Sequence, residues 1–331
     1  MAENRQLRNS LLLTLTAAIW GLAFVAQSEG SQYMGSCTFT GLRSLIAAAA
    51  LLLVIWLSER RSPVKPGVTK EVKPGVTNEV KPGATNDVMP GPDRASGAKG
   101  LWKAGMICGT LLCIASLVQQ EGISLGTGAG KAGFITATYI VLVPIFNWLL
   151  FRHRTSPLLW LGVAVGLVGL YFLCMDTSFT IQRSDLLVLI CAVAFCFQIL
   201  AVDRFSPCYD SLKLSAIQFL TCGVLASILM VFRDIIPVGL STWAAPFASW
   251  DAWIPLLYAA IFSSAIGYTL QIIGQKGLNP TLASLLMSTE SLFAVLTGWL
   301  ILHQRLTPRE LLGAALVAVA VVLAQLAPKR Q

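Results

Sequence analysis

Residues 120–139, QEGISLGTGAGKAGFITATY, have a counterpart 151 positions further along the chain, QIIGQKGLNPTLASLLMSTE at 271–290. The same offset aligns several identical residues beyond these two stretches. These pairs are Trp148 and Trp299, Arg154 and Arg305, Pro157 and Pro308, and Gly162 and Gly313. The sustained match predicts that the chain consists of two related halves.

The N-terminal part of the chain repeats at a larger offset, 175, which aligns Arg43 with Gln218. The 24 additional residues equal three tandem octads at 64–87, VKPGVTKE, VKPGVTNE and VKPGATND. A Pro-Gly pair in every octad opposes helix and favours turns. We therefore expect residues 59–100 to form a disordered loop that is inserted into the first half only.

The composition predicts that most of the surface of the protein faces lipid. Of 331 residues, 55% are hydrophobic and 12% are charged, whereas soluble domains carry about 25% charged residues. A bilayer core is spanned by roughly 20 apolar residues in a helix. Ten such segments are present, near 10–28, 39–58, 103–120, 129–151, 156–174, 185–203, 212–232, 252–274, 280–302 and 308–327.

No segment alternates apolar and polar residues as the strands of a membrane β-barrel do. The sequence therefore predicts an all-α integral membrane protein with ten transmembrane helices. The repeat divides them into residues 1–176 and 183–331, with five helices each. Because five is odd, the second half enters the membrane from the opposite side, and inverted repeats of this kind are typical of transporters. A site between the halves would then be exposed to each side in turn.

Lys and Arg predict the orientation of the chain. With the N-terminus in the cytoplasm, 18 of them face that side: Arg5, Arg8, nine in the 59–100 loop and its edges, Arg152, Arg154, Arg204, Lys213, Lys276, Lys329 and Arg330. Five face the other side: Lys131, Arg183, Arg233, Arg305 and Arg309. The bias predicts that both termini are cytoplasmic. We expect the net charge of +8 to reflect topology, with no nucleic-acid partner.

Several motifs, in the same order in both halves, resemble the EamA family of the drug/metabolite transporter superfamily. They are WGLAF at 20–24, Arg43, GKAGFITATYIVLVP at 130–144, STESLFAVLTGWL at 288–300, LTP at 306–308 and Gly313. The resemblance implies a ten-helix fold with a central cavity in a bacterial inner membrane, and movement of small metabolites such as amino acids or drugs, with export favoured. The family often has a glutamate after the ninth helix, where this chain has Gln304.

Glu290 is the first candidate for a functional site. It lies about ten residues into the ninth predicted helix, which places it near the middle of the bilayer. A charge there costs at least about 2.5 kcal/mol, so the carboxyl group needs a cavity or a partner. It could couple transport to protons or bind a substrate amine, or it could hold helix ends together by hydrogen bonds. Its repeat counterpart is Tyr139, a polar residue at matching depth.

Three further residues, Trp20, Lys131 and Arg43, complete the predicted site. We expect Trp20 to line the cavity together with Tyr139 and Glu290. We expect Lys131 and Arg43 to lie near the outer mouth of the cavity. Trp20 could form a wall of the cavity or pack against a neighbouring helix. Lys131 could attract an anionic group or extend to the lipid headgroups. Arg43 could form a structural ion pair or contact the substrate.

The residue pattern gives no reason to expect a cofactor, a metal site or catalytic residues. The eight cysteines are scattered and contain no CxxC pair, so we expect them to be packing residues. The expected partners are a small-molecule substrate and the lipid bilayer, with protons as a hypothesis that rests on Glu290. A membrane-embedded enzyme or a non-transporting scaffold stays an alternative, and the chain could be a monomer or a homodimer.

Overall fold

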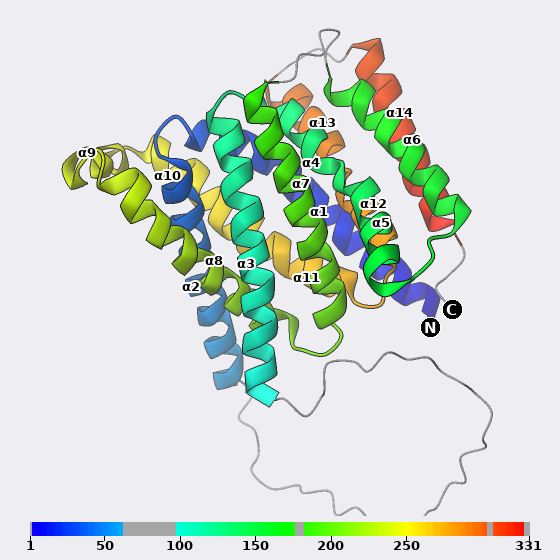
Figure 1. Ribbon diagram of the computed structural model, residues 1–331, viewed down its shortest axis with the longest axis horizontal. Helices are drawn as coiled ribbons and strands as arrows, with labels where there is room; N and C mark the ends of the chain where they lie inside the picture. Colours follow the sequence, from blue (N-terminus) through cyan, green and yellow to red (C-terminus); the bar gives the residue numbers. More distant parts are fainter. Residues whose placement is uncertain (1, 62–96, 176–181, 303–306, 328–331) are drawn as a thin grey trace, which may run out of the picture.

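The computed structural model describes residues 2–61, 97–175, 182–302 and 307–327. Every regular element among these residues is a helix (Figure 1). The α-helices are α1 (Ala2–Gly30), α2 (Ser36–Arg61), α3 (Gly97–Ser124), α4 (Ala129–Ala137), α5 (Tyr139–Phe151), α6 (Pro157–Cys174), α7 (Arg183–Phe205), α8 (Ser211–Met230), α9 (Leu240–Ala244), α10 (Trp250–Leu257), α11 (Thr269–Gln275), α12 (Pro280–Met287), α13 (Glu290–Leu302) and α14 (Pro308–Gln325). Short π-helices η2 (Val231–Ile235) and η4 (Tyr258–Tyr268) and the 3-10 helix η3 (Ala245–Ala248) join some of them.

Ten helical stretches in the described part of the chain are long and apolar enough to cross a membrane. We number them spans 1 to 10 in chain order. Spans 1, 2 and 3 are α1, α2 and α3, spans 5 and 6 are α6 and α7, and span 10 is α14. Span 7 is α8 with η2. Span 4 combines α4 and α5, span 8 combines α10, η4 and α11, and span 9 combines α12 and α13. The predicted fold class and number of membrane helices are therefore confirmed.

The predicted loop at 59–100 was too wide at both ends. Helix α2 continues to Arg61 and α3 begins at Gly97, so residues 59–61 and 97–100 are helical. The predicted disorder of residues 62–96 and the departure at Gln304 lie outside the described residues.

Matching helix starts occur at repeat positions in the two halves. Ser156 caps α6 by accepting a hydrogen bond from the backbone N–H of Leu159, and Pro157 is the first helical residue. In the second half Thr307 caps α14 in a capping box with Glu310, and Pro308 follows it. A polar cap followed by proline satisfies free backbone N–H groups and presets the first helical turn. The same local signal therefore starts spans 5 and 10.

Corresponding spans of the two halves make corresponding contacts. Span 1 packs against spans 8 and 9, and span 6 packs against spans 3 and 4. Spans 2 and 7 pack on each other, as do spans 5 and 10. If each span is exchanged for its counterpart in the other half, the contacts of span 1 with spans 8 and 9 become the contacts of span 6 with spans 3 and 4. The pairs 2 and 7, and 5 and 10, stay the same. This pattern is what two halves related by a two-fold axis would give, while their inverted orientation stays a prediction from the sequence.

Helices α6 and α14 lie side by side at one edge of the bundle (Figure 1). Glycines allow their close approach, because a Cβ atom on Gly169 would lie 2.8 Å from the backbone N of Val317. Around the molecule, large apolar side chains such as Leu149 and Phe232 are more than half exposed. Such a surface is stable against lipid tails and would be unusual in water.

Candidate functional site

Two membrane spans are interrupted at equivalent places. Span 4 breaks at Thr138, between α4 and α5, and span 9 breaks at residues 288–289, between α12 and α13. The hydroxyl of Thr138 donates to the carbonyl of Ile135 at 2.6 Å, and that of Thr289 donates to the carbonyl of Leu286 at 2.6 Å. These bonds satisfy carbonyl groups near the breaks, which the membrane interior requires.

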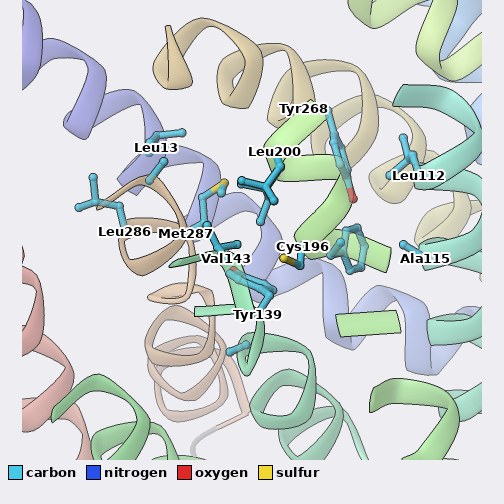
Figure 2. Close-up of a cluster of buried hydrophobic side chains, with 14 of the residues drawn as sticks. Leu13, Leu112, Ala115, Tyr139, Val143, Cys196, Leu200, Tyr268, Leu286 and Met287 are labelled. Carbon is cyan, nitrogen blue, oxygen red and sulfur yellow. The ribbon is translucent and has the colours of Figure 1, made fainter. Parts of the chain in front are cut away.

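The two breaks bring Tyr139 and Glu290 together. Each is the first residue of the helix that follows the break, and they are 151 residues apart, as are the two threonines. The phenol of Tyr139 donates to Glu290 Oε1 over a long 3.4 Å, and both residues are buried. Figure 2 shows Tyr139 in the same buried cluster as Tyr268, Cys196 and Leu200. No ion pair involves Glu290 within the described ranges.

A small cavity adjoins this contact, with about 40 Å³ open to the centres of water-sized molecules. It is lined by Trp20, Ala23, Phe24, Gln27, Arg43, Gln119, Thr136, Tyr139, Phe195, Gln198, Ile199, Ser263, Tyr268, Gln271 and Glu290. These residues come from spans 1 to 4 of the first half and spans 6, 8 and 9 of the second. All except Trp20 are buried. The cavity therefore lies where the two halves meet.

Four of the five predicted site residues line this cavity: Trp20, Arg43, Tyr139 and Glu290. Trp20 also packs, as the alternative interpretation expected. Its indole N–H donates to the carbonyl of Ser263 at 3.1 Å, and its ring lies 4.6 Å from that of Tyr268. A Cβ atom on Gly267 would come within 2.8 Å of Trp20 Nε1, so this glycine makes room for the indole.

Arg43 is a buried cation, 5% exposed, at the wall of the cavity. Its guanidinium lies 5.7 Å from the centre of the Phe39 ring, and its Nε atom has no hydrogen-bond partner. No carboxylate within the described residues forms an ion pair with it. The expected structural ion pair is therefore absent there, and a donor is available to a molecule in the cavity.

Glutamine side chains form a second polar wall. Gln271 Nε2 donates to Gln198 Oε1 at 3.1 Å, and Gln198 Nε2 donates to Gln218 Oε1 at 3.4 Å. These amides link spans 6, 7 and 8. The Oε1 atoms of Gln27 and Gln271 are buried and lack a partner among the described residues. Both residues line the cavity, so it contains hydrogen-bond acceptors as well as a donor.

Lys131, predicted near the outer mouth of the cavity, is not among the residues that line it. Its ammonium group lies 2.5 Å from Asp185 Oδ2, and the carboxylate also accepts hydrogen bonds from Thr127 Oγ1 and the backbone N–H of Gln182. Neither predicted role for Lys131 included this ion pair. The spacing of Gln182 and Asp185, typical of a capping box, was the signal that could have indicated Asp185.

The sequence did not indicate Ser263 and Tyr268 as cavity residues. They belong to the π-helix η4, whose wider turns change the direction of side chains relative to an α-helix. The apolar run at 252–274 predicts only a membrane helix. No residue pattern within it marks where an α-helix becomes a π-helix.

Comparison with known proteins gives the class. Residues 8–72 and 182–326 match the EamA-like transporter family. An Archaeoglobus fulgidus protein described as an uncharacterized transporter is 29% identical over 68% of this chain and 69% of its own length. The Bacillus subtilis protein YwfM, also described as a transporter, is 23% identical over 97% of this chain and 95% of its own length. YedA of Escherichia coli K12, described as an inner membrane transporter, is 27% identical over 58% of this chain and 61% of its own length.

A solved crystal structure aligns over 96% of both chains with a TM-score of 0.70. Its sequence is 16% identical, so it shows a shared fold alone. The ten spans and the family match define a multi-pass membrane transporter. The chain belongs to the EamA-like transporter family. Its partners therefore include a small-molecule substrate and the lipid bilayer, and its class is transport, not catalysis.

Proposed function

We propose that the cavity between the halves is the substrate site of a secondary transporter that works by alternating access. The observation that carries this proposal is Glu290, a buried carboxyl group at a helix break, with only the long contact from Tyr139 as a hydrogen-bond partner in the described chain. An acid in this position becomes more stable by binding a proton or a cationic group of a substrate. Both events would change with the direction in which the cavity opens.

The polar groups of the cavity favour a small amphipathic substrate. Glu290 and the Oε1 atoms of Gln27 and Gln271 can accept hydrogen bonds from an ammonium group. Arg43 can donate to a carboxylate or another acceptor. Trp20 and Tyr268 offer aromatic faces for an apolar part. Amino acids and drug-like amines combine these features, and export is the direction that the family resemblance favours.

Two contacts support closure at opposite ends of the cavity. At one end Asp185 on span 6 binds Lys131 on span 4 and Thr127 before it. At the other end Asn9 Nδ2 on span 1 donates to the carbonyl of Lys276, in the turn before span 9, at 2.8 Å. Each contact joins one half to the other and involves few groups. In the proposed cycle one contact opens while the other stays closed.

The Lys and Arg distribution supports a bacterial inner membrane location with both termini in the cytoplasm. Asn9 and Lys276 would then close the cytoplasmic side, and Lys131 and Asp185 the outer side. Labelling single cysteines placed at Asn4 and at Gln331 in intact cells tests this orientation. Labelling by a membrane-impermeant reagent without permeabilisation would contradict it.

Flux in proteoliposomes tests the proposal. Purified protein is reconstituted and given a panel of labelled amino acids and small amines, with and without a pH gradient. We expect saturable movement of one substrate class that responds to the gradient, and loss of that response in Glu290→Gln. Gradient-driven accumulation at the wild-type rate by Glu290→Gln would contradict proton coupling through this residue. No movement of any compound by folded, inserted protein would contradict transport through the cavity.

A further inference from the structure

A second hollow lies on the outside of the bundle, where spans 4 and 5 meet the loop 152–156 that joins them. We call it the span 4–5 groove. It is lined by Pro144, Ile145, Trp148, Arg154, Thr155 and Trp160 and is open to the surroundings of the protein. None of these residues lines the central cavity. The groove is thus separate from the proposed transport site.

The apolar part of the groove faces the membrane. Trp148 is 57% exposed, Trp160 is 39% exposed and Ile145 is 40% exposed. Trp148 lies three residues before the end of α5 and Trp160 three residues after the start of α6. At 1.5 Å per residue, both indoles start about 4.5 Å inside the helix ends. This is the level at which tryptophan is enriched at membrane surfaces.

The other end of the groove is polar and basic. Arg154 is exposed there, and the neighbouring loop residue Arg152 is a second exposed cation. The hydroxyl of Thr155 is buried and has no hydrogen-bond partner among the described residues. None of the six lining residues is acidic. The groove therefore combines an apolar floor at membrane depth with the exposed guanidinium of Arg154 at headgroup depth.

We infer that the span 4–5 groove is a binding site for an anionic phospholipid. Acyl chains lie against Trp148 and Trp160, and the phosphate accepts hydrogen bonds from Arg154. Basic groups at the membrane surface attract anionic headgroups, and a guanidinium matches phosphate geometry. A second protein chain would have to cover Arg154 with an acid, whereas a lipid satisfies both ends of the groove at once. The lipid site does not depend on the proposed transport cycle.

Native mass spectrometry of the purified protein tests this site. Phosphatidylglycerol and phosphatidylethanolamine with identical chains are titrated against wild type, Arg154→Asn and Arg152→Asn. The Arg152 variant is the matched control, since it removes the same charge from the same loop without touching the groove. Asparagine also tolerates the positive φ of 55° at this position. We expect selective phosphatidylglycerol binding that weakens about fivefold in Arg154→Asn, equivalent to about 1 kcal/mol per basic group, and weakens less in Arg152→Asn, because Arg152 does not line the groove.

Two further measurements exclude other occupants. Trp148→Leu should weaken phosphatidylglycerol binding, and glycerol 3-phosphate, which lacks the chains, should not compete with the lipid. Equal binding of both lipids, or equal loss in the two arginine variants, would overturn the inference. Full competition by glycerol 3-phosphate would indicate a phosphate site without a lipid and would overturn it too. So would a dimer that forms in wild type and is lost in Trp148→Leu.

Discussion

Replacing Gly21 by alanine should push spans 1 and 9 apart at Glu290. A Cβ atom at this position would lie 2.6 Å from the carbonyl oxygen of Glu290, 2.7 Å from the backbone N of Ala294 and 2.8 Å from Cβ of Phe293. Ordinary van der Waals contact begins at 3.4 Å. The helices must therefore separate by about 0.8 Å, and two of the three atoms belong to a backbone that cannot rotate away.

The expected cost follows from two opposing terms. Inserting a methyl group into a filled contact costs about 1–3 kcal/mol, and the backbone contacts place Gly21→Ala near the upper end. Alanine gains about 1 kcal/mol over glycine within a helix. We expect a net loss of about 2 kcal/mol in the free energy of unfolding. At about 2 °C per kcal/mol for a large chain, Tm falls by about 4 °C.

Gly133→Ala provides the matched control. Gly133 lies in α4 beside the same region, but its Cβ would meet Ser291 Oγ at 3.4 Å, an ordinary contact. We expect the helix-propensity gain to dominate there and Tm to rise slightly. Both variants are heated in detergent and the folded fraction is measured by size-exclusion chromatography. The reasoning is refuted if Gly21→Ala is as stable as Gly133→Ala.

Three further substitutions test the site. Tyr139→Phe removes the hydrogen bond to Glu290 and should reduce substrate flux about fivefold, since such bonds contribute about 1 kcal/mol; unchanged flux would mean that the long contact has no role. Asp185→Asn should lower the unfolding free energy by about 1–2 kcal/mol, because Lys131 is partly exposed and the pair is weaker than fully buried ones. In a double-mutant cycle with Lys131→Met the effects should fall short of additive, and strict additivity would exclude coupling. Thr289→Val should cost about 1 kcal/mol by removing the hydrogen bond from the hydroxyl to the carbonyl of Leu286, which keeps the bond from the backbone N–H of residue 289, and an unchanged Tm would show that the helix break does not need the hydroxyl.

The sequence predicted the spans well because the length of an apolar run is a local property. Each predicted segment overlaps one of the ten described spans. The position of Glu290 along its span was predictable for the same reason, since Glu290 lies ten residues after Pro280, where span 9 begins. The offset of 151 then identified Tyr139 as its counterpart, and the structure brings the two into contact.

The side-chain partners were not predictable, because they depend on how each helix is rotated about its axis. Spans that are apolar on all faces carry no periodic signal that fixes this rotation. The ion pair of Lys131 with Asp185, and the lack of an ion pair at Arg43 among the described residues, both depend on such rotations. The contribution of Tyr268 also required the π-helix, which the apolar pattern cannot distinguish from an α-helix.

The contact between Tyr139 and Glu290 sets a limit on the charge stored at the centre of the protein. These are corresponding residues of the two halves, and their oxygen atoms lie 3.4 Å apart. Two glutamates at this separation would share one proton, because like charges so close cannot both ionise. Two tyrosines would leave no strong acid. With one tyrosine and one glutamate, the contact contains a single carboxyl group, that of Glu290. A transporter that uses this contact therefore binds and releases at most one proton or one cationic group there in each cycle.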